Sequence, residues 1–110
     1  MKENFYCRAE KLNDRNIVYG LLTYHNDEIC IITRDNNKYF IDEKTIQQCT
    51  GLKDINNNFI YVGDKLKHNE GKEFVIEFHD LKGIILSEIN GTSEYVNGTT
   101  YWTDECEIIY

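Results

Sequence analysis

The stretch CTGLKDINNNFIYVGDKLK, residues 49–67, decides how this chain is interpreted. It is rich in Asn, Asp and Gly, which form tight turns, and these residues separate short apolar runs. Three of its side chains have the 1, 3, 5 spacing of an EF-hand calcium loop: Asp54, Asn56 and Asn58. That loop requires glycine at position 6 and glutamate at position 12, where this chain has Phe59 and Lys65. The stretch therefore predicts a hairpin turn in which the asparagines supply left-handed backbone, and not a metal site.

On both sides of this turn, short apolar runs alternate with polar residues at the period of a β-strand. The expected strands are residues 5–9, 17–24, 28–34, 38–42, 46–50, 59–61, 65–68, 73–79, 83–89 and 106–110. Tight turns are expected at residues 25–27 and 35–37, and Asn90-Gly91 favours a type I′ turn. Residues 92–104 match neither pattern.

No segment keeps a helical period beyond one or two turns, so we expect an all-β protein with little helix. Residues 1–110 are expected to form a single domain, a small antiparallel β-barrel or sandwich that is SH3-like or related. Two β modules, at about residues 1–50 and 51–110, are expected to share one core. Because the chain has no proline to block strand edges, we also expect a homo-oligomer.

The bulk composition suits a folded chain without a bound metal. The chain has 110 residues, of which 41 % are hydrophobic. Its cysteines are dispersed and form no CxxC pair: Cys7, Cys30, Cys49 and Cys106. We expect them to be reduced and buried, and we expect no metal and no other cofactor. Since neither a membrane-spanning apolar run nor an apolar leader occurs, the expected location is the cytoplasm, with no membrane partner.

Negative charge is concentrated towards the C-terminus. The formal net charge is −7, from 19 acids and 12 bases, and the last base is Lys82. Such a field repels phosphate backbones, which makes nucleic acid a less favoured partner, and it attracts a basic protein. The alternative is an acidic surface that only keeps the protein in solution.

Aromatic residues lie among these acids, as they do at protein-binding hot spots. The candidate partner-binding residues are Glu94, Trp102, Asp104, Glu105 and Glu107. In the alternative interpretation, Tyr101 and Trp102 fill the core and the acids face water.

No arrangement of side chains indicates catalysis. The chain has neither a Gly-x-Ser-x-Gly elbow nor a phosphate-binding loop, so we expect that it is not an enzyme. The Asp64 side chain is expected to accept backbone N–H groups in the Gly63-Asp64 turn. Single-stranded nucleic-acid binding has one support, a possible face of aromatic and basic residues: Tyr6, Arg8, Tyr19, Tyr24, Arg34, Lys38 and Tyr39.

The stretch of residues 49–67 resembles the signature of the YopX family. That signature runs Tyr-Thr-Gly-Leu-Lys-Asp, a turn, Ile-Tyr/Phe-Glu-Gly-Asp and a strand. The matching residues are Thr50, Gly51, Leu52, Lys53, Asp54, Ile60, Tyr61, Gly63 and Asp64. Val62 replaces the usual Glu and Cys49 the usual aromatic residue. Upstream, three segments are similar to family segments: residues 5–8, 18–22 and 45–48. The likeness covers about the first 80 residues and is weaker beyond them.

The resemblance implies a phage or prophage protein of low-GC Gram-positive bacteria, with an all-β fold and oligomers. It implies no reaction. We therefore expect a protein that acts in the cytoplasm of a bacterial host by binding a basic host or phage protein. An acidic inhibitor of nucleic-acid-processing or defence machinery, such as a CRISPR nuclease, fits this expectation. The alternatives are an oligomeric structural or accessory phage protein and a single-stranded nucleic-acid-binding barrel.

Overall fold

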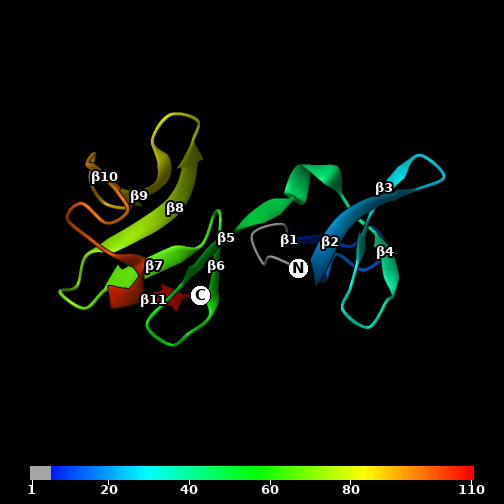
Figure 1. Ribbon diagram of the computed structural model, residues 1–110, viewed down its shortest axis with the longest axis horizontal. Helices are drawn as coiled ribbons and strands as arrows, with labels where there is room; N and C mark the ends of the chain where they lie inside the picture. The colour runs from blue at the N-terminus through cyan, green and yellow to red at the C-terminus, as the bar shows by residue number, and fades with distance from the viewer. Residues whose placement is uncertain (1–5) are drawn as a thin grey trace. The chain divides into compact units, whose positions relative to one another are not determined.

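The computed structural model describes residues 6–110, and its regular structure there is antiparallel β-sheet with two short 3-10 turns (Figure 1). This confirms the all-β prediction. The chain divides into two compact units, residues 1–49 (unit 1) and residues 50–110 (unit 2).

Unit 1 is a meander whose consecutive strands pair with one another. Its strands are β1 (Tyr6–Glu10), β2 (Ile17–His25), β3 (Glu28–Ile32) and β4 (Lys38–Phe40). After the 3-10 turn η2 (Glu43–Thr45), strand β5 (Gln47–Lys53) begins beside β1, where Gln48 pairs with Cys7. Strand β5 then continues into unit 2, where its neighbour is β6.

One face of the unit 1 sheet is buried because apolar side chains alternate along its strands. Val18 and Gly20 are buried in β2, whereas Ile17 and Tyr19 are about half exposed. The core cluster consists of Cys7, Ala9, Val18, Ile31 and Ile41. A methyl group at Gly20 would collide with the backbone oxygen of Ile32, so glycine permits the close approach of β2 and β3.

The predicted turns of unit 1 are confirmed by their backbone angles. Asn26 and Asp27 have φ of 53° and 67° and connect β2 to β3 through a two-residue loop, as a type I′ turn requires. Asn36, in the turn before β4, has φ of 69°. Asn and Asp tolerate this left-handed region better than other side chains do.

Unit 2 contains the end of β5 and the strands that follow it. These are β6 (Phe59–Tyr61), β7 (Lys65–His68), β8 (Glu73–His79), β9 (Gly83–Glu88), β10 (Glu94–Val96) and β11 (Cys106–Ile109). A five-stranded sheet has the order β10-β9-β8-β7-β11, so the last strand lies beside β7. The 3-10 turn η3 (Thr103–Glu105) immediately precedes β11.

The core of unit 2 is a separate cluster with an aromatic centre. It consists of Ile60, Leu66, Phe74, Ile76, Leu86, Tyr101, Cys106 and Ile108. The Tyr101 ring packs against Phe74 and Tyr95, with centroid distances of 5.0 Å and 4.8 Å. Each cluster lies within its own unit, and the expected core common to both modules stays a prediction.

The signature stretch is held by two buried aspartates. Asp54 Oδ1 accepts hydrogen bonds from the N–H groups of Asn56 (3.0 Å) and Asn58 (2.9 Å). Asp54 Oδ2 accepts one from Ile108 in β11 (3.1 Å), so the turn is tied to the last strand. Asp64 Oδ2 accepts from the Tyr61 N–H (2.8 Å), as expected for the turn before β7. The carboxylates therefore organise backbone, which confirms the turn interpretation.

Some local predictions are wrong. Neither Asn90 nor Gly91 has positive φ, so the type I′ turn does not form. Instead the Glu88 N–H donates to the Ser93 oxygen and closes a longer loop. Residues 92–104, which showed no pattern, contain β10 and η3. The expected fold class itself is confirmed: within residues 6–110 neither antiparallel sheet closes into a barrel, so the two open sheets match the sandwich-like alternative and not the barrel.

The four cysteines are buried and free, as predicted. Burial raises the pKa of the Cys7 and Cys106 thiols from 9.0 to about 11. Both therefore stay protonated near neutral pH and behave as small apolar side chains.

Candidate functional site

A pocket of about 240 Å³ in unit 2 contains two of the predicted partner-binding residues. It is bordered by the turn after β5, the end of β7, η3 and β11. Its lining residues are Ile55, Lys67, His68, Asn69, Glu105 and Glu107.

The wall of this pocket is fixed by the buried imidazole of His68. His68 Nδ1 accepts the N–H of Glu70 at 3.1 Å, which assigns the ring proton to Nε2. His68 Nε2 then donates to Glu105 Oε1 at 3.3 Å. The ring also meets the Tyr101 ring edge-on, at 4.8 Å between centroids. With both nitrogens engaged, His68 positions a carboxylate and offers no lone pair to a substrate.

Glu105 links the pocket to the neighbouring 3-10 turn. Its Oε1 also accepts the N–H of Trp102 at 3.3 Å, and its own N–H donates to the Trp102 oxygen at 3.0 Å. These bonds satisfy backbone groups at the start of η3. The indole of Trp102 lies over Gly98, which has φ of 88° and where a side chain would crowd the ring. Trp102 is thereby held in place while 52 % of it remains exposed.

The five predicted residues fall into separate groups. Glu105 and Glu107 line the pocket together. Trp102 and Asp104 belong to the η3 region, and Asp104 is exposed. Glu94 lies on β10, at the other end of the sheet order from β11. The structure therefore brings two of the five into one pocket, and it does not bring Glu94 there.

The alternative interpretation, in which Tyr101 and Trp102 both fill the core, is correct for only one of the two residues. Tyr101 is buried at 8 % exposure and belongs to the core cluster. Trp102 does not fill the core, because half of its surface is exposed. Tryptophan is one of the residues enriched at protein-binding hot spots, so this exposed ring is compatible with the predicted partner-binding role.

The remaining pocket residues were missed from sequence. His68 was not predicted as a site residue, although it alternates with Leu66 on the buried face of β7. That alternation could have identified it as an inward-facing side chain. Lys67 is opposite Glu107 in the β7–β11 register, and no local pattern shows this pairing.

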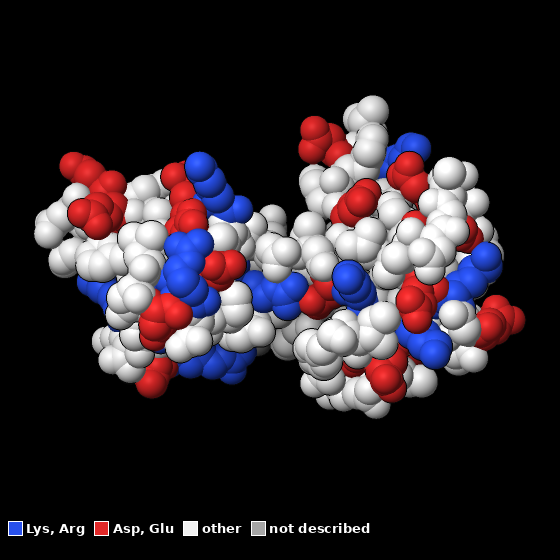
Figure 2. Space-filling model, turned by 180° about the vertical axis from the view of Figure 1, so that it is seen from behind, with Lys and Arg blue, Asp and Glu red and all other residues white. Residues whose placement is uncertain are grey.

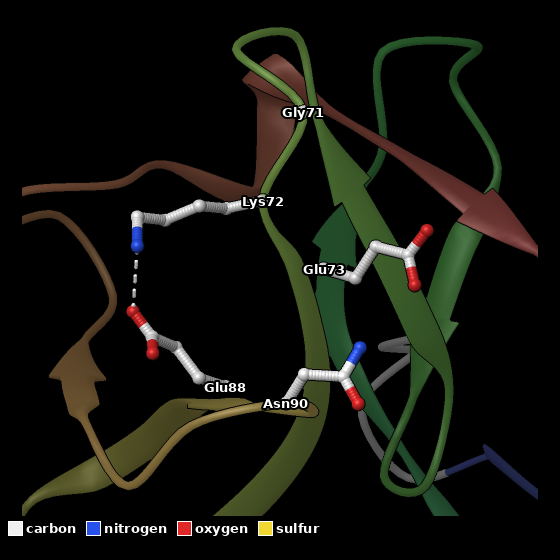
Figure 3. Close-up of a pocket in the computed structure, with 5 residues that line it drawn as sticks. All are labelled: Gly71, Lys72, Glu73, Glu88 and Asn90. Carbon is white, nitrogen blue, oxygen red and sulfur yellow. Dashed lines mark hydrogen bonds and ion pairs between the residues drawn. The ribbon is translucent and has the colours of Figure 1, made fainter.

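A second pocket, of about 360 Å³, lies where β8 and β9 meet the loops that flank them (Figure 3). Lys72 and Glu88 point towards each other across it, with 2.9 Å between Nζ and Oε1. The Tyr95 hydroxyl also donates to Glu88 Oε1, at 3.1 Å. Hydrogen bonds from Lys72 and Tyr95 lower the pKa of Glu88, and the same ion pair raises the pKa of Lys72. Glu73 and Asn90 point away from the pair, and the arrangement ties the end of β9 to β10 and to the residue that precedes β8.

Residues 6–110 contain neither a metal-binding cluster nor a membrane-spanning helix. No group of three or more His, Cys, Asp and Glu side chains is placed to hold a metal ion there. The same part of the chain contains no helix with the length and apolarity of a membrane span.

Two open antiparallel sheets, turn-forming aspartates and two small separate cores define an all-β protein built from short strands. The chain belongs to the YopX family, because the family model described as YopX protein matches residues 3–109. The likeness thus extends well beyond the first 80 residues, where it was expected to weaken. Membership suggests a small phage protein. A comparison with curated proteins gave no match.

Proposed function

We propose that this protein is not an enzyme and that it binds a basic host or phage protein through unit 2. In this proposal it acts in the bacterial cytoplasm as an acidic inhibitor of nucleic-acid-processing or defence machinery, such as a CRISPR nuclease. The observation that carries the proposal is Trp102, exposed and held over Gly98 next to the pocket of Glu105 and Glu107.

The charge distribution supports unit 2 as the docking unit. Residues 50–110 carry 11 acids and 5 bases, whereas residues 1–49 carry 8 acids and 7 bases. Almost all of the net charge of −7 therefore belongs to unit 2. On the face shown in Figure 2, carboxylates are spread among uncharged residues and interrupted by single Lys and Arg side chains. The electrostatic field of an acidic unit accelerates the encounter with a basic surface. The exposed aromatic side chain slows dissociation of the complex.

The test compares variants that remove the anchor or the charge without disturbing the fold. Trp102→Ala removes the exposed ring, and Asp104→Lys reverses an exposed carboxylate. Glu105 is left intact because it holds His68 and the Trp102 N–H. Asp80→Lys is the matched control, since Asp80 is exposed in unit 2 and lies in the β8–β9 turn.

Tagged protein is used to capture partners from a host lysate, and a captured protein is then purified for kinetic measurements. We expect Trp102→Ala to accelerate dissociation and Asp104→Lys to slow association, most strongly at low salt. Asp80→Lys should change the association rate less. If both variants bind the purified partner as the parent does, unit 2 is not the docking unit.

We also propose self-association, which the alternative of an oligomeric phage protein requires. Two apolar side chains near the β8–β9 turn support it, Phe78 at 61 % and Leu81 at 93 % exposure. The test is light scattering of the parent and of a Phe78→Ser, Leu81→Ser variant. We expect the parent to exceed its monomer mass of 13.0 kDa and the variant to fall to it. A parent that stays monomeric at high micromolar concentration contradicts this proposal.

A further inference from the structure

One face of the sheet in unit 1 gathers aromatic and basic side chains from strands β1, β2 and β4 and from the turn before β4. In the register, Arg8 is opposite Tyr19, and Tyr6 is opposite Leu21. Leu21 is opposite Ile32, which is in turn opposite Lys38. Directly opposed residues share a face in an antiparallel sheet. Five side chains of this set form the aromatic–basic face: Tyr6, Arg8, Tyr19, Arg34 and Lys38.

Two aromatic residues of the set proposed from sequence lie on the opposite face of the same sheet. Tyr24 and Tyr39 alternate onto the side that carries Val18 and Ile31, which is the core side. The aromatic–basic face is therefore narrower than the set proposed from sequence. Tyr6, Arg8 and Tyr19 lie on the adjacent strands β1 and β2, and Lys38 lies on β4 beyond β3, a span that one extended ligand can cover.

Contacts on this face orient planar groups. The Arg34 guanidinium lies over the Tyr6 ring, 5.2 Å from its centroid. Arg8 Nε donates to Gln47 Oε1 at 2.8 Å, which fixes the guanidinium beside Tyr19. Tyr19 is 50 % exposed, and Lys38 is exposed at the end of the row. Rings and guanidinium planes presented in this way are platforms on which bases stack.

Several acids of unit 1 pair with cations that lie outside the aromatic–basic face. Arg15 lies 3.0 Å from Glu10 and 2.9 Å from Asp42, and Lys11 lies 3.4 Å from Asp14. These carboxylates already have cations of their own. The strong acidity that argues against nucleic-acid binding belongs to unit 2, whereas unit 1 is nearly neutral overall.

A pocket lies next to Lys38, at the end of the aromatic–basic face. This pocket of about 360 Å³ at the β4 edge is lined by residues that include one cation and one acid: Leu12, Asn13, Glu28, Lys38, Tyr39 and Phe40. Phe40 lies on the same side of the sheet as Lys38 and is 42 % exposed. This pocket is large enough for a base, with a cation beside it for the phosphate.

We propose that the aromatic–basic face binds single-stranded nucleic acid. Four features of this face support binding: the shared register, the exposed Tyr19 ring, the oriented guanidinium groups and Lys38 at the end of the row. Tyr19 and Tyr6 stack bases, and Arg8, Arg34 and Lys38 contact phosphates. Since these groups offer ring faces and charge, and not a pattern of donors for base edges, binding tolerates sequence and weakens with salt. This goes beyond the proposed function, because it assigns a different ligand to the other unit.

The test is fluorescence anisotropy with a fluorescein-labelled oligothymidylate of about 16 nucleotides, a length that spans one small β domain. Tyr19→Ala is compared with Tyr24→Ala, which removes the same side chain from the same strand on the opposite face. We expect Tyr19→Ala to weaken binding by about tenfold or more, and Tyr24→Ala to leave it unchanged. Tyr19→Phe should retain binding, because it keeps the ring.

A second pair of variants tests the charge. Lys38→Ala should lower the slope of log affinity against log salt by about one phosphate contact, whereas Lys44→Ala, in η2, should not. Lys38 is exposed, so this comparison remains informative if Tyr19→Ala does not fold.

Three results would overturn the proposal. The first is no binding of the oligonucleotide by the parent at about 50 mM salt. The second is equal loss of binding in Tyr19→Ala and Tyr24→Ala. The third is a dimer of the parent that Tyr19→Ala dissociates, since the face would then be an interface between copies. Asp104→Lys is expected to leave oligonucleotide binding intact, which separates this test from that of the partner protein.

Discussion

Replacing Asp54 by alanine tests the central role of the signature turn. The substitution removes acceptors from three backbone N–H groups, those of Asn56, Asn58 and Ile108. Two of these groups lie in a turn that water reaches, so each loss costs about 1 kcal/mol of net stability. The Ile108 N–H is buried with the carboxylate, and leaving it without an acceptor costs about 1–3 kcal/mol. We therefore expect a loss of about 3–5 kcal/mol, a large share of the 5–15 kcal/mol that is typical of a folded domain.

The assay is urea unfolding with a matched control. Asp35→Ala removes a carboxylate that also bonds within a tight turn, to Thr33 and Asn37, but on the exposed surface of unit 1. It should change the unfolding midpoint far less than Asp54→Ala does. Asp54→Asn should recover only part of the loss, because its amide retains one acceptor and presents a donor elsewhere. If Asp54→Ala lowers the unfolding free energy no more than Asp35→Ala does, the Asp54 turn does not hold β11 in place as we infer.

Three further outcomes follow from packing and burial. Gly20→Ala should lower the unfolding free energy by about 3 kcal/mol in urea titrations, because its methyl group meets the Ile32 backbone; a change below about 1 kcal/mol contradicts the collision. Gly98→Ala should quench or shift Trp102 fluorescence by displacing the indole, and an unchanged spectrum argues against that contact. The pKa of Cys7 and Cys106 rises from 9.0 to about 11 on folding. The two thiols therefore contribute fully to the free energy of unfolding below pH 9.0, and this contribution is lost as the pH rises to about 11. The Cys7→Ala, Cys106→Ala variant should show a shallower loss of stability over that window, and a profile parallel to that of the parent excludes the thiols as the cause.

Local sequence patterns were sufficient for much of unit 1 because its contacts are between neighbours in the chain. Asn26 and Asp27 form the turn that their chemistry favours, and the alternation around Val18 predicts which face of β2 is buried. The same rules fail at Asn90 and Gly91. There Glu88 bonds to Ser93, Lys72 and Tyr95, and these contacts select a longer loop over the intrinsic preference.

The candidate site could be predicted only in part. The exposed acids and Trp102 were recognisable from composition, but the pocket depends on pairing between distant segments. Glu107 meets Lys67 because β11 lies beside β7, and Glu105 meets His68 across 37 positions of sequence. The structural use of Glu105 could not be inferred, since an acid beside other acids has the same local signature whether it binds a partner or a buried histidine.

The bond between Asp54 and Ile108 has a consequence for the order in which a nascent chain becomes structured. It joins positions 54 residues apart, and closing a flexible segment of that length costs about 3.5 kcal/mol in chain entropy. Unit 1 is built mainly from its own consecutive hairpins and can assemble while translation continues. Unit 2 must wait until β11 has left the ribosome, because β11 supplies the partners of both β7 and the Asp54 turn. Until then its strands remain open to proteases and to chaperones, so a pause in synthesis before residue 106 extends the period of greatest vulnerability.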